Sequence, residues 1–411
     1  MEDHRNPSQH PVIVIGGGPA GLTAAIALAE AGVPTALVAR SRSDDRRTSA
    51  LLHGSVTALD TLGVWTRCER DAAPLRRMRI VDDTVRLIRA PEVCFDAGEI
   101  GLDAFGYNIE NRHLLAALDA RAAELPRLQR FETDATSVVT GDRSASVTLA
   151  DGRTLTAPLV VGADGHRSLC RAAAGIESDS HRYGQTALTF NLSHSRSHRD
   201  TSTEFHTESG PFTVVPLPGL RSSLVWVMRP FEARRVAALD PGALAAAIER
   251  RAHSLLGSVR VEPGYGTFPL GVATTRGLAR RRIALVGEAA HLIPPIGAQG
   301  LNLGLRDAAA IADLVAGMHR HGGADGGSTA DLGADAVLNR YEATRRTDVA
   351  TRGLAVDLLN RSLLTGFLPV QGARGLGLYL MDRIGPFRRA VLREGVAPMA
   401  GQPRLMRGEP L

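Results

Sequence analysis

Short apolar runs alternate with amphipathic stretches along the chain, and the first of them predicts a strand, a turn and a helix. Val12 to Ile15 is a run of β-branched residues, which is typical of a buried strand. Gly16 to Gly21 predicts a turn, Leu22 to Ala31 an Ala-rich helix that ends at Gly32, and Thr35 to Ala39 a second strand. The N-terminal region is therefore expected to form a βαβ unit.

Further along the chain the hydrophobic period switches several times between helical spacing and strict alternation. We expect a helix over 47–63, antiparallel strands over 75–105, a helix over 111–125, a hairpin over 146–163 that turns at Asp151-Gly152, strands over 183–230, and helices over 242–256 and 302–318. A Gly-rich loop over 321–335 precedes a tail that is expected to be helical.

This order predicts an α/β protein whose domains are interleaved. Segments of nucleotide-binding type (1–74, 108–182 and 275–330) alternate with β-rich segments (75–107 and 183–274), and a helical segment (336–411) follows. The fold class is therefore a Rossmann-like domain, a β-rich domain inserted into it twice, and a helical C-terminal tail.

Composition narrows the classes of protein. The chain has 411 residues, of which 44% are hydrophobic and 22% charged, as in soluble proteins of more than one domain. All 48 basic residues are Arg, which excludes a lysine Schiff base or a lysine general base. The net charge of +5 is scattered, with no basic stripe interleaved with aromatic residues, and this argues against nucleic-acid binding.

Cysteine usage and hydropathy indicate the cellular compartment in which the protein works. Cys68, Cys94 and Cys170 show no metal-ligand spacing and form no complete disulfide set, so we expect no metal site and a reducing, cytoplasmic compartment. The polar start MEDHRNPSQH has no signal-peptide core. The most apolar window, 11–39, contains a glycine-rich turn and Glu30, so it is interpreted as strand, turn and helix and not as a membrane span.

The segment VIVIGGGPAG matches the dinucleotide-binding pattern G-x-G-x-x-G at Gly16, Gly18 and Gly21. Gly16 permits the tight turn, Gly18 lets the backbone approach a pyrophosphate, and Gly21 lets the helix pack closely on the strand. The helix N-terminus then faces the phosphates.

The acidic residue that usually ends the second strand of such a unit is absent. Ala39-Arg40 stands there instead. An Arg would suit the 2′-phosphate of NADP, whereas Asp44 or Asp45 would replace the missing acid. This segment alone therefore leaves FAD and NADP open.

Two later segments repeat the arrangement of a buried strand that ends in a polar turn. LVVGADGHRSLCR contains Asp164-Gly165, and RIALVGEAAHLIPPIGAQGLN contains Gly287-Glu288 followed by a loop rich in Gly and Pro and a helix start. Each segment alone also fits a plain strand-to-helix connection, in which Asp164 or Ser168 caps the next helix and His291 is a structural histidine.

Together the three segments resemble the FAD-dependent aromatic hydroxylases, the flavin monooxygenases related to para-hydroxybenzoate hydroxylase. That family has an N-terminal G-x-G-x-x-G, a middle Asp-Gly motif and a late Gly-Asp motif, with Glu288 here in place of the usual Asp. GEAAHLIPPIGAQGLNLGLRD, FGYNIENRHLLAAL and the tail over 356–395 resemble the ubiquinone-biosynthesis hydroxylases in particular.

The resemblance implies a role for each motif. The nucleotide-type segments would bind FAD and the β-rich segments would hold the substrate. The residues implied in FAD binding are Gly16, Gly18, Gly21, Arg47, Arg112, Asp164, Gly165, Gly287, Glu288, Gly300, Leu301 and Asn302. The residues implied next to the reacting ring are Pro295, Gln299 and His291, with His291 and Tyr107 as alternative general bases.

The activity implied is hydroxylation of an aromatic ring, with NAD(P)H as reductant, O2 as oxygen donor and a flavin C4a-hydroperoxide as oxidant. The substrate implied is a hydrophobic aromatic molecule, a polyprenylated phenol of ubiquinone biosynthesis. Three other interpretations stay open: a hydroxylase or epoxidase of another aromatic or polyketide substrate, a non-catalytic flavin-binding assembly subunit, and an NADP-dependent dehydrogenase that rests on Arg40.

The C-terminal tail combines apolar residues at helical spacing with arginines. They are Leu354, Leu358, Leu359, Leu363, Phe367 and Leu368, followed by Arg374, Arg383, Arg388, Arg389 and Arg393. An apolar face with basic rims binds anionic membranes, so we expect either peripheral contact with the inner membrane or packing on the domain, on another subunit or in a biosynthetic complex.

Overall fold

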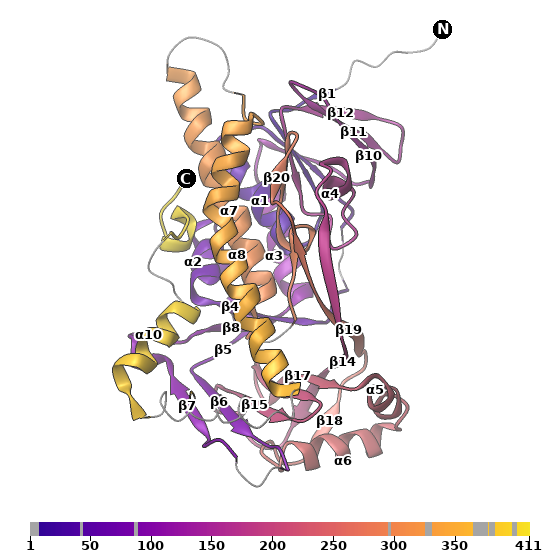
Figure 1. Cartoon of the computed structure of the whole chain (residues 1–411), viewed down its shortest axis with the longest axis vertical. Helices are drawn as coiled ribbons and strands as arrows, with labels where there is room; N and C mark the ends of the chain where they lie inside the picture. Colours follow the sequence, from indigo (N-terminus) through magenta and orange to yellow (C-terminus); the bar gives the residue numbers. More distant parts are fainter. Residues whose placement is uncertain are drawn as a thin grey trace.

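The computed structural model describes residues 8–41, 44–85, 89–294, 297–324, 331–364, 377, 383–396 and 401–411. Two β-sheet layers lie one above the other along the longest axis, and long helices run beside them (Figure 1). The upper part in that view contains a mostly parallel sheet with helices packed against it, and the lower part a larger, mainly antiparallel sheet. The expected α/β class is confirmed.

A six-stranded sheet in the order β20-β21-β13-β2-β3-β9 forms the centre of the upper part. Its strands are β2 (Val12–Ile15), β3 (Thr35–Val38), β9 (Leu128–Phe131), β13 (Leu159–Gly162), β20 (Ala279–Arg280) and β21 (Ile283–Leu285). All neighbours except β20 and β21 pair in parallel. The β-branched run of β2 is fully buried because α1 and the four-stranded sheet described below pack with it in one apolar core.

The helices on this sheet are α1 (Pro19–Glu30), α3 (Asn111–Ala123) and α7 (Gln299–Ala324). Helix α1 packs against both α3 and α7, and α7 packs against α8 (Asp335–Leu364). The βαβ unit is confirmed, with α1 beginning three residues before the expected start because Pro19 occupies its first turn.

A four-stranded sheet, in the order β1-β12-β11-β10, lies beside it. Its strands are β1 (Ser8–Gln9), β10 (Ala135–Thr140), β11 (Ala145–Leu149) and β12 (Thr154–Ala157). Strands β11 and β12 form the expected hairpin, and Gly152 takes the left-handed conformation its turn requires, with φ of +84°. The chain then leaves this sheet and enters β13.

The expected helix over 47–63 is wrong in its first part. Strand β4 (Thr48–Leu52) precedes helix α2 (His53–Thr61) and joins a three-stranded sheet with β5 (Ala72–Pro74) and β8 (Gly106–Glu110). Strand β4 is antiparallel to β8, so backbone pairing with a distant segment overrides the local helical pattern. Short 3₁₀ turns η1 (Trp65–Arg67) and η2 (Glu69–Asp71) follow.

The lower part is a nine-stranded sheet in the order β22-β19-β14-β17-β16-β15-β6-β7, with β18 paired to β14. The strands are β6 (Arg77–Asp82), β7 (Val93–Asp96), β14 (Ser178–His194), β15 (Thr201–Thr207), β16 (Gly210–Leu217), β17 (Arg221–Met228), β18 (Val259–Val261), β19 (Gly266–Thr275) and β22 (His291–Leu292). The alternation expected over 75–105 and 183–230 forms most of it.

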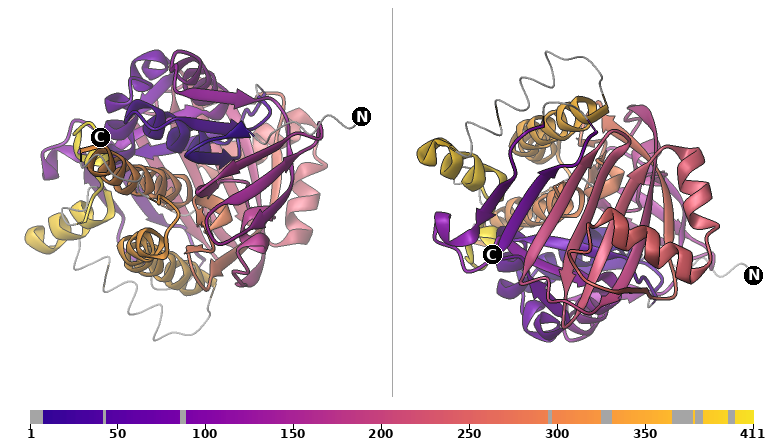
Figure 2. Two further views of the ribbon diagram at one scale, coloured as in Figure 1. Left: turned by 90° about the horizontal axis from the view of Figure 1, so that it is seen from above. Right: turned by 90° about the horizontal axis from the view of Figure 1, so that it is seen from below.

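Helices cover one face of this sheet. Figure 2 shows α5 (Pro230–Ala237) and α6 (Pro241–Arg251) on its outer side. They pack with Leu188, Phe190 and Leu224 in one apolar core, which leaves the opposite, inner face turned toward the rest of the molecule.

The remaining elements are short or lie near the C-terminus. They are η3 (Ala97–Ile100), α4 (Leu169–Ala173), η4 (Gly287–Ala289), α10 (Gly385–Val396) and η5 (Arg404–Arg407), the last of which packs on α2. Among the helices the structure describes, none combines the length and apolar character that crossing a membrane requires.

Candidate functional site

The three polar turns lie together at one edge of the six-stranded sheet. Strands β2, β13 and β21 are parallel neighbours, with Ile15 paired to Gly162 and Gly162 paired to Leu285. The turns that follow them therefore leave the sheet side by side at its carboxyl edge, which is where open α/β sheets bind ligands.

The glycines of the first turn shape a cradle at the start of α1. A Cβ on Gly16 would lie 2.2 Å from the Ala163 carbonyl oxygen, and one on Gly21 would lie 2.1 Å from the Gly16 carbonyl oxygen. A Cβ on Gly18 would meet nothing within 4 Å. Gly18 occupies the N-cap position of α1, where no side chain accepts a hydrogen bond from the first turn. This open, uncapped helix N-terminus fits a pyrophosphate.

Arg47 lies beside this edge and is held in place by Asp45. Its Nε and Nη2 donate to the two Asp45 oxygens at 2.8 and 2.6 Å, and Asn111 donates to Asp45 at 3.0 Å. Burial would raise the pKa of Asp45, but the hydrogen bonds from Arg47 and Asn111 hold that pKa below its ordinary value. The hydrogen bonds that Arg47 donates to Asp45 raise the pKa of Arg47, and the charge of Glu288 in the third turn adds to this.

Arg112 follows β8 at the start of α3. Its Nε lies 3.1 Å from an oxygen of Glu110, whose side chain is buried and also accepts from Arg221 at 2.9 Å. Its backbone N–H donates to the carbonyl oxygen of Asp45 at 2.8 Å. Arg112 and Arg47 are therefore anchored to the same short segment.

Asp164 of the second turn is engaged within its own turn. Its oxygens accept from the Ser168 hydroxyl at 2.6 Å and from the Cys170 N–H at 3.0 Å, while Ser168 caps α4 by accepting from the Arg171 N–H. Gly165 takes a φ of +80° with open space beside it. Asp164 and Ser168 thus form the helix-capping hydrogen bonds that the sequence allowed. These bonds also hold Gly165 at the open edge of the sheet.

The third turn presents a carboxylate to solvent. Gly287 has a φ of +61° and donates its N–H to Asp307 at 3.1 Å, and a Cβ there would lie 3.3 Å from Ala20 of α1. The Glu288 side chain that follows is exposed. A buried anchor therefore holds the turn close to the start of α1, while the Glu288 side chain is exposed.

His291 has a structural place in the molecule. Its Nε2 lies 2.6 Å from Asp307 Oδ2, and the two side chains are 2% and 1% exposed. The other oxygen of Asp307 accepts from Arg345 at 2.7 Å. Burial would raise the pKa of Asp307, yet the neighbouring charges of His291 and Arg345 hold it below its ordinary value. This geometry favours the interpretation of His291 as a structural residue over that of a general base.

The start of α7 is tied to β4 by Asn302. Its amide nitrogen donates to the carbonyl oxygens of Ala50 and Ala298 at 2.8 and 2.6 Å, and its oxygen accepts from the Leu52 N–H at 2.8 Å. Gly300 and Leu301 lie in the same first turn. Asn302 thus fixes where the helix N-terminus points, which matters because that end favours negative charge.

The structure describes only some of the residues expected next to the reacting ring. Pro295 lies outside the described residues. The Gln299 side chain donates to the Gly297 carbonyl oxygen at 3.0 Å and accepts from Arg352 of α8 at 3.2 Å. Tyr107, the alternative base, packs against Trp65 with ring centroids 5.1 Å apart and the ring planes tilted by 60°.

Arg40, on which the NADP interpretation rests, has another partner. Its Nε lies 2.8 Å from Asp134, and both side chains are more than half exposed. Asp45, one substitute for the missing acid, is occupied by Arg47 and Asn111.

Sequence reasoning missed several residues that organise the site. Asp307 and Asn111 anchor predicted site residues, and their signal is only a polar residue within a helical pattern. Glu204 of β15 pairs with the buried His206 on the same strand, with 2.7 Å between Oε1 and Nε2. A Glu-x-His spacing on an expected strand, which puts both side chains on one face, could have pointed to it.

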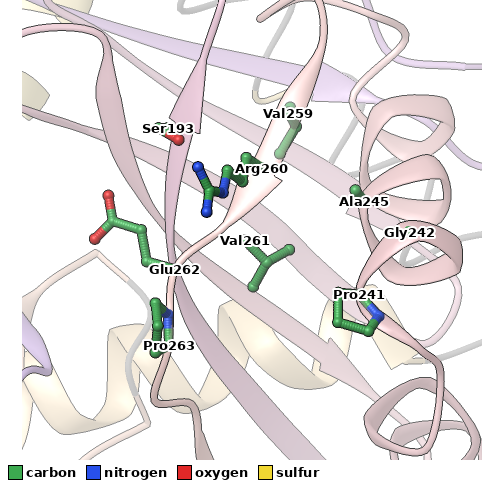
Figure 3. A pocket seen from close by; sticks show the side chains of 9 residues that line it. All are labelled: Ser193, Pro241, Gly242, Ala245, Val259, Arg260, Val261, Glu262 and Pro263. Carbon is green, nitrogen blue, oxygen red and sulfur yellow. The ribbon is translucent and has the colours of Figure 1, made fainter.

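A hollow lies on the lower part, away from this edge. Figure 3 shows Arg260 on β18, Glu262 just after it, and Pro241 and Ala245 on α6. None of the residues expected to bind FAD lines it, so the glycine cradle and not this hollow is the candidate cofactor site.

Fold and site define the class of protein, which is a dinucleotide-binding flavoprotein. The carboxyl edge of its parallel sheet carries a glycine cradle, an anchored arginine and an exposed carboxylate. The chain belongs to the FAD binding domain family, which it matches over residues 9–349. FAD is its cofactor, and it is a flavin-dependent monooxygenase.

Relatives align over almost the whole chain. It is 37% identical to the ubiquinone hydroxylase UbiL of Rhodospirillum rubrum, over 97% of this chain and 93% of the relative. It is 30% identical to the 3-demethoxyubiquinol 3-hydroxylase of Escherichia coli, over 93% of this chain and 97% of the relative.

Solved structures share the fold. The p-nitrophenol 4-monooxygenase PnpA of Pseudomonas putida superposes with a TM-score of 0.76 at 20% identity, covering 95% of this chain and 98% of that one. HpxO of Klebsiella pneumoniae, solved with FAD and uric acid, gives 0.74 at 20% identity, covering 96% and 97%.

Proposed function

We propose that this chain hydroxylates the aromatic ring of a polyprenylated phenol intermediate of ubiquinone biosynthesis, with NAD(P)H as reductant and O2 as oxygen donor. One observation carries the proposal: the relatives named for ubiquinone hydroxylation align over both the FAD-binding and the β-rich parts of the chain. A shared cofactor domain alone would leave the β-rich part unmatched.

The residues at the sheet edge would divide the work of holding FAD. Gly16, Gly18 and Gly21 would form the seat of the pyrophosphate, and Arg47 and Arg112 would supply the guanidinium groups that suit phosphate oxygens. The contacts that support this are the open side of Gly18 and the anchoring of both arginines to the segment around Asp45.

The remaining residues would position the sugar-like chain and the ring system. Asp164 and Gly165 would line the middle of the site, and Gly287-Glu288 would accept hydroxyl hydrogen bonds. Pro295, Gln299 and the turn Gly300-Leu301-Asn302 would border the ring. When bound, FAD supplies the redox chemistry, and the protein has to orient the substrate and exclude water.

We further propose that the C-terminal helices contact a membrane surface from which a prenylated substrate is taken. Apolar side chains on α8, on α10 and at the residue just before α10 are exposed: Leu354, Leu358, Ile384, Phe387 and Val391. Of the residues expected to bind there, Phe367, Leu368 and Arg374 lie outside the described residues, as do the side chains of Leu359 and Leu363. Arg388 instead pairs with Glu99 at 2.6 Å.

The first experiment is the visible spectrum of the purified protein, before and after denaturation, followed by NAD(P)H oxidation with a short-chain polyprenylphenol. Two flavin bands, released FAD and phenol-stimulated oxidation with formation of a hydroxylated product support the proposal. A flavoprotein that hydroxylates only small soluble phenols, or that oxidises no NAD(P)H with any phenol, contradicts it. Co-sedimentation with anionic liposomes at low salt tests the membrane contact, and Phe387→Ser with Val391→Ser should weaken it.

A further inference from the structure

The inner face of the nine-stranded sheet, opposite α5 and α6, is turned toward the FAD-binding part. Asn108 of β8 donates to the Ser223 hydroxyl of β17 at 3.0 Å, and Asn191 of β14 donates to the Arg46 carbonyl oxygen at 3.2 Å. Asn191 and Ser223 are register partners, so one row of this face touches the cofactor-binding segment directly.

The next row along the same face is only half-buried. It consists of Thr189, Val225, Thr213, Glu204 and Ile80, which are successive register partners on β14, β17, β16, β15 and β6. All five side chains are of intermediate exposure. Because the rows before and after it are mostly buried at β14 and β17, this row is where the inner face remains accessible.

One end of the half-buried row lies beneath a proposed FAD contact. The guanidinium carbon of Arg47 lies 5.6 Å from the ring centroid of Phe268 on β19. That ring covers Gly266, since a Cβ there would fall 2.3 Å from Phe268, and Gly266 is the register partner of Thr189. From Thr189 the row crosses three strand spacings to Glu204, roughly 14 Å.

The row carries its one charge near its other end. Of the five side chains, Glu204 alone is ionisable, and it is 19% exposed. Its Oε1 pairs with His206 Nε2 at 2.7 Å and its Oε2 accepts from the Thr213 hydroxyl at 3.3 Å. Burial would raise the pKa of Glu204, but the bonds to His206 and Thr213 hold it below its ordinary value. An ionised carboxylate therefore faces the accessible row.

His206 is buried next to Glu204 and holds its carboxylate in place. Its side chain is 3% exposed, and its Nδ1 is buried without a hydrogen-bond partner in the part of the chain that the structure describes. Asp82, its register partner on β6, directs its own oxygens to Thr84 and Ala90. The hydrogen bond of His206 with Glu204 is thus formed although the other ring nitrogen of His206 stays unsatisfied, which costs free energy.

We propose that Glu204 accepts the hydrogen bond of the substrate's phenolic hydroxyl and so determines both the orientation of the ring and the preference for a free phenol. His206 is the positioning residue that keeps Glu204 ionised and aimed at the row. This inference rests on the proposed function and identifies the residue that would recognise the phenolic hydroxyl. A carboxylate acceptor also makes the ring more electron-rich, as insertion of oxygen requires.

A phenol and its methyl ether separate this role from a structural one. The probes are a phenol with a two-isoprene side chain ortho to the hydroxyl and the corresponding methyl ether. Their Kd values are measured from flavin absorbance changes of the oxidised holoenzyme, without turnover. Because a hydrogen bond to a charged group contributes about 1.5–3 kcal/mol, the wild type should bind the phenol about 10- to 100-fold more tightly than the ether.

The variants are Glu204→Gln, which keeps the shape and removes the charge, and Glu177→Gln as a control at an exposed carboxylate. Glu204→Gln should lower the phenol-to-ether ratio about tenfold or more while FAD content stays at wild-type level, and Glu177→Gln should change neither. Should Glu204→Gln fail to fold, Glu204→Asp withdraws the carboxylate by one methylene and should lower the same ratio.

Two results overturn the inference while leaving the function intact. One is a wild type that hydroxylates the phenol yet binds the ether equally well. The other is a Glu204 variant that weakens both ligands by the same factor, which is the behaviour of a purely structural residue. A wild type that hydroxylates no phenol at all overturns the proposed function, and the role of Glu204 with it.

Discussion

His291 and Asp307 form a buried pair with 2.6 Å between Nε2 and Oδ2, directly beneath the turn that carries Glu288. The same Asp307 oxygen accepts the N–H of Gly287, and its second oxygen accepts from Arg345. One carboxylate therefore joins the third turn, α7 and α8. The histidine that the sequence offers as a base is part of the support for the cofactor site.

Replacing Asp307 should cost stability and cofactor together. Asp307→Asn removes the charge that compensates Arg345, whose side chain is 1% exposed, and breaking a buried ion pair costs about 3–5 kcal/mol. We expect a lower urea midpoint and loss of FAD on gel filtration. The matched change Asp335→Asn, at an exposed residue in the first turn of α8, should leave both unchanged. Wild-type FAD content in a destabilised Asp307→Asn would show that the turn holds without this anchor.

Acid should unfold the chain through the same cluster. The pKa of Asp307 and that of Asp348, which pairs with Arg306, Arg345 and Arg352, both lie below their ordinary value of 3.8 because of those charges, although burial opposes it. Depressed folded-state pKa values mean that this stabilisation is complete above about pH 4 and is lost as the pH falls through the folded values.

The measurement is the free energy of unfolding by urea between pH 7 and pH 3 for the wild type and Asp348→Asn. The variant should be less stable at neutral pH and should lose less on acidification. Parallel curves for the two proteins would assign the acid sensitivity to other groups.

The three glycines of the first turn should separate into two kinds. Gly21→Ala places a Cβ 2.1 Å from the Gly16 carbonyl oxygen, so we expect destabilisation by about 1–3 kcal/mol or more. Gly18→Ala meets no protein atom within 4 Å, so the apoprotein should keep its stability while FAD binds at least tenfold more weakly. Thermal unfolding of the apoprotein and FAD titration distinguish the two, and equal effects of both changes on the apoprotein would remove Gly18 from the proposed pyrophosphate seat.

The sequence predicted this edge well because its signals are local. A buried β-branched run, a glycine turn and an Ala-rich segment specify strand, turn and helix within about twenty residues, and the later strands ending at Gly162 and Gly287 carry the same pattern. The structure then adds that β2, β13 and β21 are parallel neighbours.

The missed features depend on distant partners. Thr48–Leu52 is a strand because it pairs with Gly106–Glu110, which no local pattern shows. Strand β15 lies within the expected strands over 183–230, but the roles of Glu204 and His206 depend on their contacts with each other and with Thr213. His291 offered the more familiar signal and proved to be paired with a residue sixteen positions away.

Asp45 holds Arg47 in one orientation, which the proposed contact of Arg47 with FAD would require. Its two hydrogen bonds to Asp45 use one side of the guanidinium, and an Arg fork is pre-organised for anion binding when its stem is fixed. Arg47→Lys keeps the charge but loses the paired contact, and Asp45→Asn keeps the shape but frees the arginine. We expect each to weaken FAD binding about tenfold, and the double variant to be far less than a hundredfold weaker, because both changes break one interaction. Fully additive effects in FAD titration would show that Asp45 acts on the cofactor independently of Arg47, as a separate contact to the ribose would.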